Sequence, residues 1–365
     1  MVFHGCAALC CIWRHIGLWP TRRLGHTTLQ MARFPITKSY LDTAALAGRL
    51  EDEYDLADVR CRLISATLRD VHLVTTSRRR FIFYVYRHGY RIREQIAAEW
   101  HFIDHLASCG VSVAPAVPAR NGTLLLSFDA PEGTRYGVLT TFVDGQHLRQ
   151  RPSVPAVRTY GRHIATIHTA ADAMSAPLNR PVIDIVAILD EAVADAERAL
   201  IERPDVVAYL RECATKLRPD LDPLPQEPPA YGVIHGDVIR ANALVGDDGT
   251  VTVLDFDFCG IGWRAYDVAS YLLTIRNTPT EAEFAEAFLA GYTDIRALKP
   301  EERGAMPLFE AVRAIFAIGT PAKYVDHWGS EYLYAFLDQS LGRLERTMQQ
   351  LTHHREHAAS RRRRQ

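Results

Sequence analysis

The sequence predicts a two-lobed α+β protein: a small lobe built on an antiparallel sheet with one inserted helix, then a larger, mainly helical lobe. Three observations lead to this fold class. The chain has 365 residues and 48% hydrophobic content, which is enough for a sizeable core and two lobes. Runs of β-branched and aromatic residues concentrate before residue 145. Beyond residue 154 the apolar residues recur mostly with the helical period.

We expect the small lobe over residues 34–145. Alternating and β-branched runs predict its strands, an Asn121-Gly122 turn precedes one of them, and Asp144-Gly145 ends the sheet. In chain order we expect a helix at 44–54, two strands around a loop at 65–70 within 61–76, a strand at 80–87, a helix at 92–108, and strands at 124–128 and 136–143.

We expect the large lobe over residues 146–351. A Pro-rich linker at 219–229 precedes two apolar runs that are joined by an evident turn at 246–249, which predicts a β-hairpin. The helical periodicity predicts helices at 156–171, 183–200, 205–217, 266–276, 281–292, 301–318 and 330–350.

The two ends of the chain look different from both lobes. Residues 1–30 contain no acid and no periodic pattern, so we expect a disordered or misannotated extension, with Met31 as an alternative start. Residues 352–365 include four consecutive arginines at 361–364, and we expect a basic, disordered tail.

Composition restricts the partners. A formal net charge of -1 argues against a nucleic-acid-binding protein, and no apolar run reaches the ~20 residues of a membrane span. The seven cysteines are odd in number and lack the spacing of zinc ligands, which favours a reducing, cytoplasmic location. We expect no nucleic acid or membrane partner, and a monomer or homodimer.

Three short polar side chains stand between apolar runs in the second half of the chain: Asp237, Asn242 and Asp255. Polar groups in apolar surroundings are costly unless something satisfies them, and a magnesium–nucleotide complex would do so. Carboxylate and amide oxygens suit Mg²⁺, and a loop Asp can accept the proton of an attacking hydroxyl. The alternative is a β-hairpin that carries acids by chance.

The motif H-G-D-V-I-R-A-N at 235–242, followed by L-D-F-D at 254–257 and C-G-I-G-W-R-A-Y-D-V-A at 259–269, resembles the aminoglycoside phosphotransferase / choline kinase superfamily. This group includes relatives of homoserine kinase type II and of bacterial stress-response kinases. The resemblance spans roughly residues 34–351 and is strongest at 231–271. It implies a protein-kinase-like fold and phosphorylation of a small-molecule hydroxyl with ATP and Mg²⁺. Asp237 would be the catalytic base, and Asn242 and Asp255 would hold the metal.

The small lobe departs from the family pattern at the nucleotide site. Tyr84 occupies the position of the phosphate-binding Lys, and the phosphate loop, 65–70, which begins at Ser65, has no glycine. Glu99 occupies the position of the helix carboxylate that pairs with that Lys. It falls on the apolar stripe, meaning the apolar face of the helix predicted at 92–108, and a carboxylate there needs a cation. Arg69 and Arg80 are the candidates, along with Arg87, which points to the other strand face. Alternatively, Glu99 reaches solvent at the edge of the stripe.

Thr141, Phe142 and Val143 resemble the hinge between lobes. There, a backbone N–H and C=O would form hydrogen bonds with adenine, and an apolar side chain would pack beside the base. The alternative is an ordinary strand end.

Two other functions remain open: a bacterial Ser/Thr protein kinase of the stress-response type, or a non-catalytic nucleotide-binding pseudokinase, because the Lys position is Tyr84. The sequence does not name the acceptor or decide between ATP and GTP.

Overall fold

The computed structural model describes residues 36, 38–174 and 177–362, with the backbone alone at 354–362. The predicted extension at 1–30 lies outside the described residues. From Lys38 onward the described residues belong to one compact unit, which contains all the helices and strands. Within the described residues, no helix has the length and apolarity needed to cross a bilayer.

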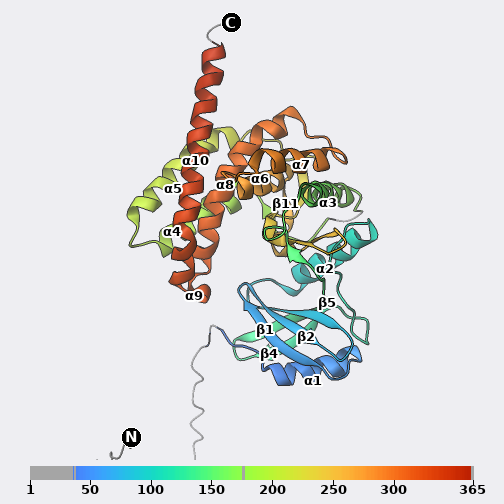
Figure 1. Ribbon diagram of the computed structural model, residues 1–365. Helices are drawn as coiled ribbons and strands as arrows, with labels where there is room; N and C mark the ends of the chain where they lie inside the picture. Colours follow the sequence, from blue (N-terminus) through green and yellow to red (C-terminus); the bar gives the residue numbers. More distant parts are fainter. Residues whose placement is uncertain (1–35, 37, 175–176, 363–365) are drawn as a thin grey trace, which may run out of the picture. The chain divides into compact units, whose positions relative to one another are not determined.

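The first half of this unit is built on a five-stranded antiparallel sheet in the order β1-β2-β3-β5-β4. Figure 1 shows α1 against this sheet and α2 between the sheet and the helical part. The bounds are α1 Thr43–Tyr54, β1 Arg60–Ala66, β2 Arg69–Thr75, β3 Arg80–Tyr86, α2 Arg93–Ser108, β4 Leu126–Ala130 and β5 Gly133–Thr141.

The segment predicted as a phosphate loop at 65–70 is mostly strand. β1 continues to Ala66 and β2 begins at Arg69, so only Thr67 and Leu68 form the turn between them. Ser65 is an exposed strand residue opposite Val71, at an irregularity in the β1–β2 ladder. The apolar and β-branched residues on both sides extend the hydrogen-bonded ladder and leave a short hairpin turn.

The second half is mainly helical, with two three-stranded sheets in the orders β10-β9-β6 and β7-β11-β8. Its strands are β6 Gln146–His147, β7 Val182–Ile183, β8 Tyr231–Ile234, β9 Ala243–Val245, β10 Val251–Val253 and β11 Gly260–Trp263. Its α-helices are α3 Val154–Asp172, α4 Glu191–Ala199, α5 Pro204–Leu221, α6 Arg264–Ile275, α7 Glu281–Thr293, α8 Pro300–Lys323, α9 Val325–Trp328 and α10 Ser330–Arg362, with a π-helical turn at Val186–Asp190 before α4.

Several helices differ from their predicted bounds. The helix predicted at 183–200 begins as strand β7 and a π-helical turn. The Pro-rich linker starts later than expected because α5 continues through Pro219 to Leu221. At the end of the chain, α10 continues to Arg362, whereas we expected a disordered tail from residue 352. That segment is free of Gly and Pro and contains good helix formers, which lets an existing helix propagate.

Two apolar clusters hold the unit together. The smaller one lies between α1 and one face of the five-stranded sheet and is centred on Leu50, Val74 and Phe83. The larger one begins on the opposite face, at Tyr86 and Val138, includes α2, and continues through the helical part. The sheet and the helical part therefore share one core across α2, which fixes the segments that carry the site.

Helices α3 and α7 pack with their backbones in close approach. A Cβ added to Gly291 would lie 1.9 Å from the carbonyl oxygen of Arg158, and one added to Gly161 would lie 2.2 Å from that of Phe288. Both positions need glycine because no flexible side chain can give way there.

We therefore predict that Gly291→Ala lowers the free energy of unfolding by about 1–3 kcal/mol or more. The matched control is Gly304→Ala in α8, where an added Cβ meets nothing within 4 Å. This change should stabilise the protein by up to about 1 kcal/mol, since alanine is the better helix former. Urea unfolding of the two variants measures both effects. Equal stabilities would contradict the close packing of α3 against α7.

Candidate active site

The predicted catalytic loop follows β8 and begins at His235. Gly236 has a φ of +79°, in the left-handed region, and a Cβ there would lie 2.2 Å from the carbonyl oxygen of Phe258. The loop therefore passes so close to the segment after Asp255 that only glycine fits at this position.

Asp267 in α6 holds the start of this loop. Its Oδ2 accepts a hydrogen bond from the His235 N–H at 2.7 Å, and its Oδ1 accepts one from the Gly236 N–H at 2.8 Å. Oδ2 also lies 3.0 Å from Nε2 of His168, whose Nδ1 lies 2.8 Å from the hydroxyl of Tyr292. All three side chains are fully buried, so the network is satisfied internally and holds the start of the loop backbone.

His235 links the catalytic loop to the predicted metal loop. Its Nε2 lies 2.9 Å from the carbonyl oxygen of Leu254, and its Nδ1 accepts the Asp237 N–H at 3.2 Å. The ring also packs against Phe256 with centroids 4.5 Å apart. Both ring nitrogens are used by the backbone, which is a structural role.

Asp237 and Asn242 lie together at the two ends of the loop. Nδ2 of Asn242 donates to Asp237 Oδ2 at 2.6 Å and to the Asp237 carbonyl oxygen at 2.9 Å. The other carboxylate oxygen, Oδ1, accepts a hydrogen bond from Nη2 of Arg313 in α8. The side chains of Asp237 and Arg313 are only 14% and 12% exposed, so this ion pair is largely shielded from water.

Asp255 begins the metal loop in the left-handed conformation, with φ +64°. This backbone conformation is uncommon outside glycine and typical of functional sites. Its side chain is 46% exposed, and Oδ1 accepts from Arg69 Nη2 at 2.6 Å. The donor set fits a hard cation: Asn242 uses its amide nitrogen on Asp237, which leaves its oxygen, and Asp255 keeps a second carboxylate oxygen.

Glu99 in α2 is fully buried between two arginines. Arg69 Nη1 lies 3.3 Å from its Oε1, and Arg180 Nη1 lies 3.2 Å from its Oε2. The Tyr86 hydroxyl also donates to Oε1 at 3.0 Å. Burial raises the pKa of the Glu99 carboxyl, and the charges of Arg180 and Arg69 oppose that shift. The alternative that Glu99 reaches solvent is therefore wrong.

The two candidate arginines lie in different places. The Arg69 guanidinium is buried and stacks over the ring of Tyr84 at 4.2 Å, so it lies where Glu99, Tyr84 and Asp255 meet. Arg80 is exposed, pairs with Asp144 at 2.5 Å and lies 4.2 Å from the ring of Phe142. Of the two, the structure brings only Arg69 to Glu99. Arg87 contacts the Ala66 carbonyl oxygen at 3.0 Å instead.

The predicted hinge lies at the end of β5. Thr141 is the last residue of β5, and Phe142 and Val143 lead toward β6, which pairs with β9 of the helical part. The segment therefore connects the two halves of the unit. Phe142 and Val143 are half-buried, whereas Thr141 is exposed.

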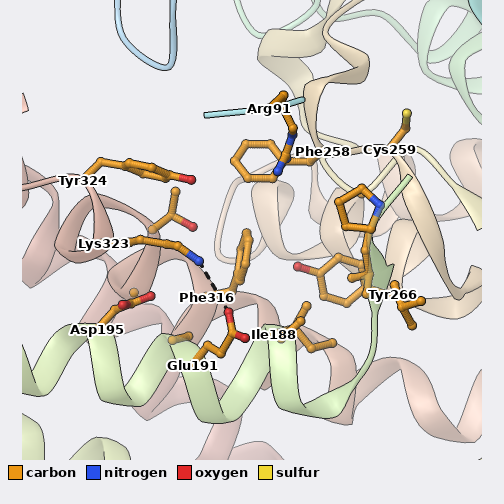
Figure 2. Close-up of a pocket in the computed structure, with 18 residues that line it drawn as sticks. Arg91, Ile188, Glu191, Asp195, Phe258, Cys259, Tyr266, Phe316, Lys323 and Tyr324 are labelled. Carbon is orange, nitrogen blue, oxygen red and sulfur yellow. Dashed lines mark hydrogen bonds and ion pairs between the residues drawn. The ribbon is translucent and has the colours of Figure 1, made fainter. Parts of the chain in front are cut away.

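A cavity of about 150 Å³ lies behind the catalytic loop (Figure 2). Its walls come from the loop, from α4 and from α8, and they mix apolar and charged groups. Figure 2 shows Glu191 and Asp195 on one side, with Lys323 3.4 Å from Glu191. Tyr266, Phe258, Phe316 and Tyr324 supply aromatic surface. Such a mixture of apolar walls and a few charged groups is usual in small-molecule sites.

Sequence reasoning missed two arginines of the site. Arg313 is the one cation in the A-V-R-A-I-F-A-I stretch of α8, and a cation on an otherwise apolar helix face requires a buried acid, which was an available signal. Arg180 gave no signal, because it lies outside the helices in an irregular segment before Pro181. It also donates to the carbonyl oxygens of Cys259 and Asp257, which fixes the segment after Asp255.

Residues 60–305 match a family model described as the phosphotransferase enzyme family, APH. An uncharacterized protein of Deinococcus radiodurans is 33% identical over 318 residues, which cover 86% of this chain and 92% of that protein. The homoserine kinase of a Methylobacterium species is 28% identical over 214 residues, which cover 56% of this chain and 62% of that enzyme.

Among solved structures, a microcompartment-associated aminopropanol kinase superposes with a TM-score of 0.71 at 24% identity, over 85% of this chain and 98% of that one. This likeness confirms the predicted two-lobed, protein-kinase-like fold, with its antiparallel sheet and larger helical part.

We predict a pH-dependent stability that originates at His168. Burial lowers the pKa of this His to about 4, from an ordinary value of 6.5. Below pH 6.5 the histidine of the unfolded chain is protonated, whereas the buried histidine of the folded protein stays neutral. The contribution of His168 to the free energy of unfolding is therefore fully present above pH 6.5. It decreases toward pH 4, by at most about 3 kcal/mol.

Urea unfolding of the wild type and of His168→Gln between pH 4 and 7.5 measures this effect. The variant is less stable near neutral pH because it loses hydrogen bonds, but its stability should depend less on pH in that window. Parallel curves for the two proteins would exclude His168 as the origin.

We also predict that Arg69→Ala weakens ATP binding by roughly tenfold to more than a hundredfold, the range expected for a lost charge-assisted contact. Arg80→Ala is the matched control, because Arg80 pairs with Asp144 at the surface and should leave affinity unchanged. Tyr84→Lys should give no gain, since the Arg69 guanidinium already covers that ring. Calorimetric titration with ATP and Mg²⁺ compares the three variants, and tighter binding by Tyr84→Lys would show that no arginine replaces the Lys.

Proposed function

Because the chain belongs to the phosphotransferase enzyme family, we propose that it transfers the γ-phosphoryl group of ATP to a hydroxyl of a small molecule in a Mg²⁺-dependent reaction in the cytoplasm. Membership in the family confirms the prediction of a phosphotransferase with an alcohol group as acceptor. The observation that carries the proposal is that Asn242 and Arg313 both hold the shielded carboxylate of Asp237.

Asp237 is proposed to orient the acceptor hydroxyl and take its proton. The hydroxyl oxygen forms a bond to the γ-phosphorus, the bond from that phosphorus to the bridging oxygen breaks, and ADP leaves. Asn242 holds Asp237 Oδ2 at 2.6 Å and so fixes the direction of the carboxylate. Positioning of this kind supplies much of the acceleration in phosphoryl transfer.

Asn242 and Asp255 would hold Mg²⁺ through their free oxygens. When bound, Mg²⁺ neutralises charge on the phosphates. Arg69 would supply the positive charge that the family's Lys provides, because it already contacts Glu99 and Asp255. This arrangement favours an active enzyme over the pseudokinase that Tyr84 suggested.

The size of the acceptor is inferred from the relatives. Two of the proteins named above are described as a homoserine kinase and an aminopropanol kinase, and both of those acceptors are small alcohols. A small alcohol is therefore favoured over a protein Ser/Thr acceptor.

The test is phosphoryl transfer by Asp237→Asn and Asp255→Ala across a panel of small alcohols. Asp237→Asn should lower turnover by roughly 10²- to 10⁴-fold, the usual contribution of a general base, while ATP still binds. Asp255→Ala should remove the Mg²⁺ dependence of ATP binding.

Asp247→Asn is the control, since this exposed turn residue pairs with Arg151, far from the proposed catalytic groups. Wild-type turnover by Asp237→Asn would refute the assignment of the base, and an unchanged Mg²⁺ dependence would remove Asp255 from the metal site.

A further inference from the structure

Three arginines from separate elements of the helical part lie in or near the catalytic loop. Arg313 of α8 contacts Asp237 Oδ1 directly. Arg240 lies in the catalytic loop, three residues after Asp237, and its Nη2 donates to the Thr274 carbonyl oxygen at 2.8 Å. Arg343 lies half-buried on α10, which packs along α8.

The charges of these arginines are poorly balanced. Within the described part of the chain, neither Arg240 nor Arg343 forms an ion pair with a carboxylate, and Arg313 pairs only with Asp237. The pKa of Arg343 is lowered by burial and by the neighbouring charges of Arg240, Arg346 and Arg313, so these guanidinium groups repel one another.

Buried polar atoms beside the cluster lack a hydrogen-bond partner among the described residues. They include Nε of Arg240 and the hydroxyl of Tyr271. Arg240 reaches α6 at the Thr274 carbonyl oxygen, one helical turn from Tyr271, and its charge opposes the rise of the Tyr271 pKa that burial causes. Buried donors without partners, next to unbalanced positive charge, are the expected surroundings of an anionic ligand.

We propose that the acceptor is an anionic alcohol, and that Arg240, Arg313 and Arg343 bind its carboxylate or phosphate group. This inference rests on the proposed function. Because the Arg313 guanidinium already contacts Asp237, an anion held by the same group lies only a few bonds from the hydroxyl that Asp237 deprotonates. The arginines thus select acceptors by the distance between the anion and the hydroxyl.

The terminal phosphate of ATP is the competing ligand, and the position of the cluster argues against it. The nucleotide candidates Arg69, Tyr84 and Glu99 come from the five-stranded sheet and α2, and a small cavity between them reaches Asp255. The three clustered arginines come instead from the catalytic loop, α8 and α10 of the helical part.

The experiment compares paired alcohols that differ by the anionic group. L-Homoserine is paired with 3-aminopropan-1-ol, and glycerol 3-phosphate with glycerol, so that the two pairs separate a carboxylate from a phosphate. We measure kcat/KM for each, and the KM for ATP, with the wild type, Arg343→Gln and Arg303→Gln. Arg303 is exposed on the same helix as Arg313 and serves as the control.

We expect the wild type to prefer one anionic alcohol over its partner at least tenfold. Arg343→Gln should raise the KM for that anionic alcohol by about tenfold or more, with little change in its kcat, in the KM for the matching alcohol that lacks the anion, or in the KM for ATP. Its melting temperature should stay equal or rise, because the substitution relieves repulsion. Arg303→Gln should match the wild type.

Three results would overturn the inference: no preference for either anionic alcohol, a preference that Arg343→Gln retains, or a change confined to the KM for ATP. The last result would assign the arginines to the nucleotide. Turnover of only 3-aminopropan-1-ol or glycerol would refute the anionic acceptor and leave the proposed phosphotransferase function intact.

Discussion

The conformation of the catalytic loop depends on one buried carboxylate, that of Asp267. It accepts two consecutive backbone N–H groups and lies against a neutral His168, all away from water. A charge in such surroundings is tolerated only when its acceptor sites are filled, so the loop backbone and the carboxylate stabilise each other. Asp237 directly follows the two residues that this carboxylate holds, so the position of its backbone depends on the same anchor.

A second buried carboxylate, that of Glu99, joins the sheet to the helical part. Arg69 comes from β2 and Arg180 from the segment before β7, and both contact Glu99 on α2. Breaking such a pair by removing one partner is costly, because it leaves an uncompensated buried charge. The network therefore holds the five-stranded sheet to the loop that carries Asp255, through an arginine of β2 that contacts both carboxylates.

The sequence predicted the parts of the site that lie close together along the chain. The spacing of Asp237, Asn242 and Asp255 between apolar runs, and the family motif around them, led to the fold and the enzyme class that the comparisons confirm. Long-range partners were beyond it: Arg313 lies 76 residues from Asp237, and no local pattern pairs the two. The choice between Arg69 and Arg80 also needed the structure, since strand alternation favoured Arg80 but the hairpin brings Arg69 inward. The length of α10 was missed because its basic composition suggested disorder.

The contact between Arg69 and Asp255 has a thermodynamic consequence. The oxygen Oδ1 of Asp255 that accepts from Arg69 is also an oxygen that a metal would seek. When an arginine and a cation compete for one carboxylate, each lowers the affinity of the carboxylate for the other by the same factor. A nucleotide bound beside Arg69 would change that balance, because its phosphates would offer Arg69 a new anionic partner and so release Asp255. Binding of nucleotide and of metal would then be positively cooperative, through a guanidinium that exchanges one carboxylate for a phosphate.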